Sequence, residues 1–256
     1  MSIDSVTLAW LKAHYPLEFY KVALQRYTDK EKKDKVAKLK REMKVLGIEL
    51  KSIQFGQDNR SFSIDREHNC INQTMASIKN IQKKSPTILY DLQKHHYNNF
   101  IDVLKAIHDT EINIKTLTIL IQLDYFKEFG NPNQLMKIVE IYNKYADVKQ
   151  INKKNLTQQE KLIIHQYSGK ECNTIFKEID NDGLIKAFVD NLDIITTDVE
   201  KVSYELKYLG YSSMIVNSPY YGVEDIETNV GTFMTHPAYG VGAVDNISGL
   251  LTGDVN

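Results

Sequence analysis

Apolar residues recur at helical spacing through the first 47 residues. Counting from Val36, the positions i, i+3, i+7 and i+10 are apolar, while lysine and arginine fill the positions between them. This spacing predicts an amphipathic helix, and Gly47 directly after it is a typical helix end. Pro16 predicts the start of an earlier helix, because the missing N–H of a proline is harmless in the first helical turn. We therefore expect two helical pieces to meet at Pro16.

The pattern changes after residue 47 and then changes back. Apolar positions from Ile48 to Ile71 fall nearer a period of two, with turn signals at residues 57–59 and 67–69, and predict a small β-hairpin near residues 53–73. Helical spacing returns between Ser77 and Tyr145. The helices expected there are Ile78–Ile81, Ile88–Lys94, Phe100–His108, Lys115–Leu123 and Gln134–Tyr145.

The second half of the chain is more polar. Residues 147–175 carry few apolar positions, and three further helices are predicted at Leu156–Gln166, Asp182–Asn191 and Thr197–Leu209. From Ser212 onward there is no lysine or arginine, and little periodicity, so we expect a weakly structured tail. The fold class predicted is mainly α, with one small β-hairpin and an irregular C-terminal tail.

Composition narrows the classes of protein that fit. The hydrophobic content of 42% and charged content of 25% are typical of a globular protein. No apolar run is long enough for a membrane span and no signal-peptide pattern opens the chain, so we expect a cytoplasmic protein without a membrane partner. Cys70 and Cys172 lie far apart without a C-x-x-C partner and are expected as free thiols.

Charge is distributed unevenly along the chain. Lys21 to Lys44 contains ten basic residues against four acidic ones, whereas the whole chain has a net charge of −1. Such an excess suggests an anionic partner near the first third, although a solvated helix face explains it as well.

One segment carries a family resemblance. Residues 9–19 read A-W-L-K-A-H-Y-P-L-E-F and resemble the end of the fingers domain in the bacterial DNA polymerase III alpha subunit, in its DnaE and PolC forms. Further segments are similar to later parts of that family in the same order. They are Lys35–Gly47, Phe55–Lys79, Phe100–Leu104, Ile114–Asn131 and Glu205–Tyr211.

The resemblance implies a domain order. Residues 1–52 are similar to the end of the fingers, 53–146 to a β-hairpin with a tandem helix-hairpin-helix, 147–212 to a helical connector, and 213–256 form the tail. The catalytic palm of the family would precede residue 1. The resemblance thus implies a DNA-directed DNA polymerase that uses Mg²⁺ and deoxynucleotides when intact, with no catalytic residue and no cofactor in this chain.

A helix-hairpin-helix binds DNA phosphates through backbone N–H groups and a helix N-terminus, without reading bases. The family's Gly-apolar-Gly turn corresponds here to Asn80-Ile81-Gln82, and the glycine of the second hairpin corresponds to Asp124. Asn and Asp are the residues after glycine that best tolerate a left-handed backbone, so the turns can persist. The DNA-binding residues implied are Lys79, Asn80, Gln82, Lys83, Lys84, Gly130 and Asn131.

Several other motifs indicate no chemistry. Asp180-Asn-Asp182 imitates a metal-binding D-x-D and, with Glu178, a calcium loop, but Val189 stands where the bidentate glutamate belongs, so helix-capping acids are the better interpretation. His95-His96 lacks further ligands at helical spacing and is predicted to lie in a polar turn.

Two aromatic residues near the first proline are ambiguous. His14 is expected to cap the chain break rather than to bind phosphate. Trp10 is expected in the core rather than as a base-stacking platform.

The sequence therefore favours sequence-independent binding of duplex DNA as part of a replicative polymerase. Two alternatives stay open. One is a helical protein–protein interaction module that docks the remaining polymerase domains or replisome subunits without touching DNA. The other is an enzyme in its own right.

Overall fold

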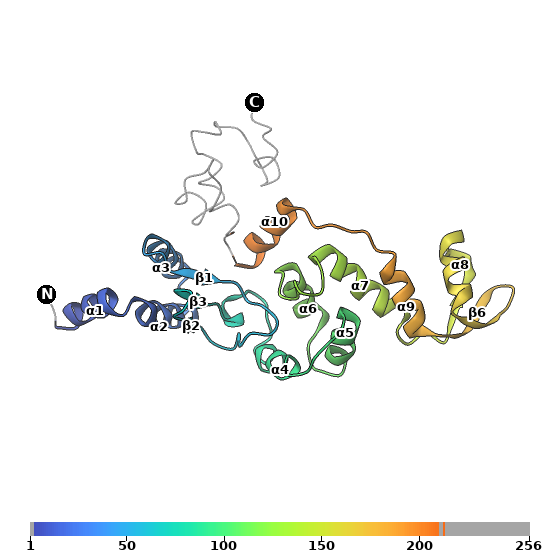
Figure 1. The fold of residues 1–256 in the computed structure, drawn as a ribbon, viewed down its shortest axis with the longest axis horizontal. Coiled ribbons are helices and arrows are strands. Elements are labelled where there is room, and N and C mark those ends of the chain that lie inside the picture. Colours follow the sequence, from blue (N-terminus) through green and yellow to red (C-terminus); the bar gives the residue numbers. More distant parts are fainter. Residues whose placement is uncertain (1–2, 210–211, 213–256) are drawn as a thin grey trace, which may run out of the picture. The chain divides into compact units, whose positions relative to one another are not determined.

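The computed structural model describes residues 3–209 and residue 212. The chain divides into two compact units. Figure 1 labels helices and strands of both. Among the described residues, unit 1 combines those up to His95, Ile112–Tyr125, and those from Thr197 to Ser212. Unit 2 combines His96–Glu111 and Phe126–Thr196. The predicted mainly α fold with a small β-hairpin is confirmed, whereas the tail from residue 213 lies outside the described residues.

Unit 1 is built mainly from helices. They are α1 (Ile3–His14), α2 (Pro16–Asp29), α3 (Lys33–Val45), the 3₁₀ turn η1 (Met75–Ser77), α4 (Ser85–Leu92), α6 (Ile114–Gln122) and α10 (Asp198–Leu209). Helix α2 begins at Pro16, as the proline predicts. Helix α3 is followed by Gly47 with a φ of 68°, the left-handed conformation that glycine adopts readily after a helix.

A three-stranded sheet follows α3 in unit 1. The strands are β1 (Glu49–Lys51), β2 (Ser63–Asp65) and β3 (Cys70–Asn72), with β3 in the centre. Strands β2 and β3 are antiparallel and form the hairpin that the sequence predicts. Strand β1 pairs with β3 in parallel and was not predicted.

The core beside this sheet comes from α2, α3 and the strands. Its buried residues are Tyr20, Leu24, Leu39, Met43, Ile48, Phe62 and Ile71. Leu39 and Met43 belong to the apolar stripe from which the helix was predicted. The spacing of apolar residues therefore identified the face of α3 that is buried.

Trp10 is not a core residue, contrary to the expectation. Its side chain is 50% exposed. The indole ring stacks on the imidazole of His14, with centroids 4.5 Å apart. A helical stripe identifies an apolar face but not the element that covers it, and no described residue buries this face of α1.

Unit 2 contains four α-helices and a second sheet among the described residues. The helices are α5 (Phe100–His108), α7 (Pro132–Tyr145), α8 (Gln158–Gln166) and α9 (Asn181–Asp190), and a 3₁₀ turn, η2, spans Lys153–Asn155. The strands are β4 (Gln150–Asn152), β5 (Ser168–Glu171) and β6 (Ile175–Ile179), ordered β4-β6-β5 and antiparallel throughout. Phe176 of the central strand is buried with Ile164 of α8 and Leu184 of α9.

Two sequence predictions about local structure were wrong. The second sheet was missed, because its edge strand Ser168–Glu171 has no apolar residue to alternate with polar ones. No helix covers Ile78–Ile81, because Asn80 has a φ of 64°, which an α-helix does not tolerate. Among the described residues, no helix combines the length and apolar character that crossing a membrane requires.

Candidate nucleic-acid interface

The first predicted hairpin lies between η1 and α4 in unit 1. Asn80 takes a φ of 64°, the left-handed backbone for which the family resemblance places a glycine. Asn80 is exposed, and so are the neighbouring lysines Lys79, Lys83 and Lys84. Lys84 is the N-cap residue of α4, so the hairpin leads directly into a helix N-terminus. Exposed lysines beside a helix N-terminus suit the binding of an anion.

Two hydrogen bonds fix the hairpin to distant segments of unit 1. The backbone N–H of Lys79 donates to the carbonyl of Tyr208 in α10 at 3.4 Å. The side-chain Oε1 of Gln82 accepts from the backbone N–H of Asn113, the N-cap residue of α6, also at 3.4 Å. The side chain of Gln82 therefore links the first hairpin to the start of α6.

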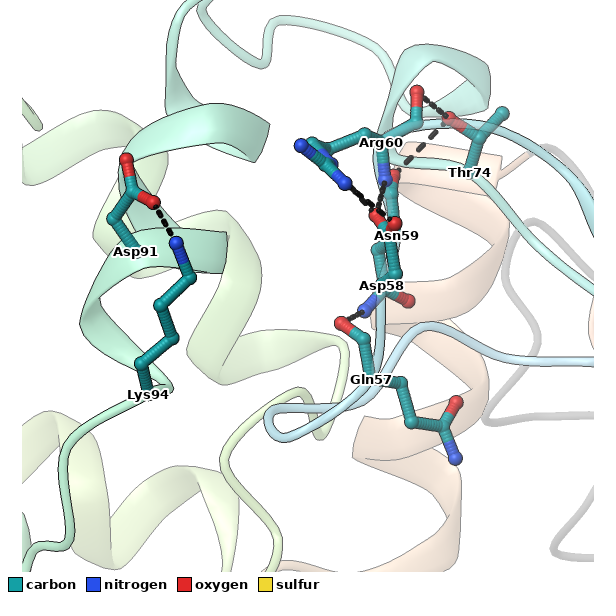
Figure 2. A network of polar contacts seen from close by, with 7 residues as sticks. All are labelled: Gln57, Asp58, Asn59, Arg60, Thr74, Asp91 and Lys94. Carbon is teal, nitrogen blue, oxygen red and sulfur yellow. Dashed lines mark hydrogen bonds and ion pairs between the residues drawn. The ribbon is translucent and has the colours of Figure 1, made fainter.

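A polar loop around the buried Asn59 contacts η1, the turn that directly precedes the first predicted hairpin (Figure 2). Asn59 is 3% exposed, and its amide donates to the carbonyls of Gln54 at 2.9 Å and Gln57 at 2.6 Å. The hydroxyl of Thr74 donates to the carbonyls of Asn59 and Arg60 at 3.2 and 3.1 Å. Thr74 also caps η1, so this loop positions the turn that leads into the hairpin.

Arg60 ties the same loop to α4. Its guanidinium donates to both carboxylate oxygens of Asp58, at 2.9 and 2.8 Å, and lies 3.6 Å from the ring centroid of Tyr90. The ammonium of Lys94 lies 4.9 Å from the same ring. It also pairs with Asp91 at 2.6 Å (Figure 2). Asp58 neutralises the charge of Arg60, so Arg60 does not add an anion-binding site to this loop.

The second predicted hairpin begins at the end of α6. Asp124 has a φ of 59°, again left-handed where the resemblance places a glycine. Its carboxylate pairs with Lys201 of α10 at 3.1 Å. The hydroxyl of Tyr208 donates to Oε1 of Gln122 at 2.6 Å, so α10 packs along α6 at this point.

Gly130 and Asn131 belong to unit 2, whereas the lysines of the first hairpin belong to unit 1. Gly130 has a φ of 150°, and an added Cβ would lie 2.7 Å from Oε1 of Gln134. The Asn131 amide donates to the carbonyl of Ile194 at 2.8 Å, and its oxygen accepts from Gln134 N–H and the Thr196 hydroxyl. The polar atoms of Asn131 are thus engaged in capping α7.

The acidic motif at the start of α9 caps a helix, as expected. Asp180 accepts from the backbone N–H of Gly183 at 3.1 Å, and Asp182 pairs with Lys105 at 2.7 Å. Across residues 3–209 and 212, no group of three or more His, Cys, Asp or Glu residues is placed to hold a metal ion.

Electrostatic contacts also organise the first helices. The ammonium of Lys12 donates to Glu42 at 2.6 Å, and this hydrogen bond lowers the pKa of the Glu42 carboxyl and raises the pKa of Lys12. Tyr20 donates to the same carboxylate at 3.2 Å. Nδ1 of His14 donates to the Trp10 carbonyl at 2.9 Å in the last turn of α1, which is the capping contact expected of His14.

Comparisons with known proteins show distant relatives of this chain. No protein-family model matches the chain. Over 130 residues the chain is 29% identical to a protein named DNA polymerase III subunit alpha from Ureaplasma parvum, a match that covers 50% of this chain and 13% of that protein. Over 120 residues it is 27% identical to a protein of the same name from Aquifex aeolicus, covering 46% of this chain and 10% of that protein.

The chain is distantly related to DNA polymerase III alpha subunits. It spans only a small part of the length of these relatives. This distant relation agrees with the family that the sequence resembles.

Sequence reasoning missed the contacts that hold the hairpin in place. Asn59 is the last residue of the turn signal at residues 57–59, and that signal was the only indication of a structured loop there. Neither the link from Gln82 to Asn113 nor the pair of Asp124 with Lys201 has a local sequence signal, because the partners lie far apart along the chain.

Proposed function

We propose that this chain is a DNA-binding portion of a DNA polymerase III alpha-type protein, lies downstream of the catalytic palm, and grips the phosphate backbone of duplex DNA through its first hairpin. The observation that carries the proposal is the left-handed Asn80 between exposed lysines at the N-terminus of α4. The distant relation to proteins named DNA polymerase III subunit alpha supports it.

Binding to DNA phosphates requires only a turn that is positively charged and accessible to solvent. Lys79 and Lys83 form no ion pair with any described residue, so their charge is available to a phosphate. Exposed lysines that neutralise phosphates release counterions from DNA, which gives binding without sequence preference. Base-edge contacts are not needed, because a turn of this kind contacts only the backbone.

The two hairpins contribute unequally in this proposal. Asp124 adds negative charge to the second hairpin, although Lys201 compensates it, and the side chain of Asn131 is engaged within unit 2. The first hairpin has no acidic residue between Ile78 and Pro86. DNA therefore binds mainly at the first hairpin.

Polymerase activity, Mg²⁺ and deoxynucleotides belong to the intact protein in this proposal. We expect no nucleotide incorporation by the chain alone on a primed template. Incorporation that persists after purification to homogeneity would show an enzyme in its own right, and would overturn this part of the proposal.

Fluorescence anisotropy with a labelled duplex tests the binding. With three phosphates neutralised, log affinity should fall against log salt with a slope of about −2.7, and the dissociation constant should lie on the order of 10⁻⁴ to 10⁻⁶ M. The triple variant K79Q/K83Q/K84Q should remove most of that slope. The matched control K149Q/K154Q/K170Q removes three exposed lysines from unit 2 and should change it little.

Two results would contradict the proposal. One is a salt titration that is flat for the unmodified chain. The other is an equal loss in both triple variants, which would indicate attraction by overall charge rather than by the hairpin.

One observation favours protein–protein docking as a second candidate function. Helix α1 exposes several large apolar side chains: Val6, Leu8, Trp10 and Leu11. Exposed apolar groups of this kind are typical of an interaction surface. Tight binding to the other polymerase domains or a replisome subunit, together with no DNA binding, would select this function over the first.

A further inference from the structure

We propose that the N-terminal turns of α4 and α6 form one surface for DNA phosphates, in which Lys115 of α6 contacts the backbone next to the lysines of the first hairpin. This inference rests on the proposed function and adds a second helix and a new residue to it. The ligand is the phosphodiester backbone of DNA.

A hydrogen bond brings the two turns together. Gln82 lies three residues before α4, and its side chain accepts from the backbone N–H of Asn113, which caps α6. Asn113 in turn accepts from the N–H of Thr116 at 2.8 Å. The hairpin and the first turn of α6 are therefore adjacent, although about 30 residues separate them in the chain.

The charges in these two turns favour an anion. The first turns of α4 and α6 contain no acidic residue, whereas such residues normally stabilise a helix N-terminus. Instead Lys84 stands at the N-cap of α4 and Lys115 in the first turn of α6, and both are exposed. A cation beside the positive end of a helix is unfavourable until an anion binds between them. Lys115 forms no ion pair with any described residue.

Two buried hydroxyls in the same turns point to a missing polar partner. Ser85 is the first residue of α4 and Thr116 the third of α6, and both are 0% exposed. Neither hydroxyl has a hydrogen-bond partner in the described part of the chain. Buried hydroxyls are normally paired, so two unpaired ones at the two adjacent helix starts indicate an ordered water beneath the surface, through which they would reach a bound phosphate.

The test compares single substitutions in the full chain. K115Q should make the plot of log affinity against log salt shallower by about one unit, as expected for one lost phosphate contact. The control K186Q removes an exposed lysine from the middle of a helix, α9, in unit 2, and should leave the slope unchanged. Circular dichroism spectra identical to that of the unmodified chain would show that both variants fold.

A second variant tests the hydrogen bond between Gln82 and Asn113. Q82A should reduce the effect of K115Q, because the hairpin and α6 are then no longer joined. Inorganic phosphate, added at constant ionic strength, should compete with the duplex for the unmodified chain more strongly than for K115Q.

The outcomes separate the two proposals. An unchanged slope in K115Q, alongside a lost slope in K79Q/K83Q/K84Q, would overturn this inference and leave the proposed function standing. An equal change in K186Q would also overturn it. No binding of duplex DNA by the unmodified chain would remove both.

Discussion

The carboxylate of Asp124 lies 3.1 Å from the ammonium of Lys201, and the two residues stand 77 positions apart in the chain. Helix α10 thus supplies the counter-charge for a residue that occupies a left-handed turn position. Both side chains are about one-third exposed, so solvent weakens the pair, and its contribution to stability stays below about 1 kcal/mol. The backbone conformation of Asp124 therefore matters more than its charge.

Substitutions at Asp124 should separate these two effects. D124G removes the ion pair but suits a φ of 59°, so the free energy of unfolding should change by less than about 1 kcal/mol. D124V places a β-branched residue in a left-handed conformation and should cost roughly 1–2 kcal/mol more than glycine. Urea denaturation measures both. Equal stability of the two variants would contradict the conformational argument.

Substitution of Asn59 should lower the free energy of unfolding more than substitution of any other residue in the loop that contacts η1. N59A would remove three hydrogen bonds, those from the backbone N–H of Gln54 and to the carbonyls of Gln54 and Gln57, although the Gln54 carbonyl keeps the N–H of Gln57 as a donor. An unsatisfied buried group costs about 1–3 kcal/mol, so a loss of about 2–3 kcal/mol is expected in chemical denaturation. The control N98A changes an exposed asparagine and should stay within about 0.5 kcal/mol. A loss below 1 kcal/mol at Asn59 would count against the loop as a rigid support.

Asn131 should act on stability rather than on DNA binding. N131A removes the cap of α7 and the contacts with Ile194 and Thr196, so stability should fall by about 1–2 kcal/mol. N131D keeps the oxygen that caps the helix and should recover part of the loss. Denaturation and the DNA salt titration are measured on the same samples. A stable N131A with a shallower salt slope would instead assign Asn131 to the DNA-binding surface.

Acid should weaken unit 1 through Asp65. A hydrogen bond from His68 at 2.7 Å lowers the pKa of the Asp65 carboxyl from 3.8 to about 2. A carboxyl with a depressed folded-state pKa stabilises the protein above its unfolded-state pKa, and this stabilisation is lost as the pH falls through the folded-state value. Stability should therefore decline between pH 3.8 and about pH 2.

Substitution identifies the group responsible for that decline. In D65N the part of the decline that comes from Asp65 should be absent, because an amide does not titrate in this range. Thermal unfolding followed at several pH values measures it. An identical decline in D65N and the unmodified chain would assign the effect to other carboxyls.

The sequence predicted elements where the local signals agreed. Helix α5 was predicted as Phe100–His108 and is found with the same bounds, because Asn99 caps it and its apolar face is buried at Val103, Leu104 and Ile107. The hairpin of β2 and β3 was also found, since apolar alternation and turn residues coincide there. The position of Asn80 as a left-handed residue followed from its alignment with a glycine in the family pattern.

The strands that the sequence did not predict form only by pairing with other segments of the chain. Strand β1 pairs with β3 across about 20 residues, and nothing in Glu49–Lys51 announces a parallel partner. Strand β5 reads Ser-Gly-Lys-Glu, which resembles a loop until β6 provides its hydrogen bonds. Trp10 lies on an apolar stripe but is half-exposed, because a stripe shows that a face is apolar without showing what packs on it.

Unit 1 is assembled from three separate stretches of the chain, and unit 2 lies between them in sequence. During synthesis, the residues of unit 2 are complete once Thr196 has left the ribosome, while the hairpin of unit 1 still lacks α10, with which Lys79 and Asp124 make their contacts. Closing such long loops slows folding. A nascent chain that stalls before Thr197 would therefore carry all the residues of unit 2 but an unsupported first hairpin, and the emergence of α10 would set the time at which that hairpin gains its contacts.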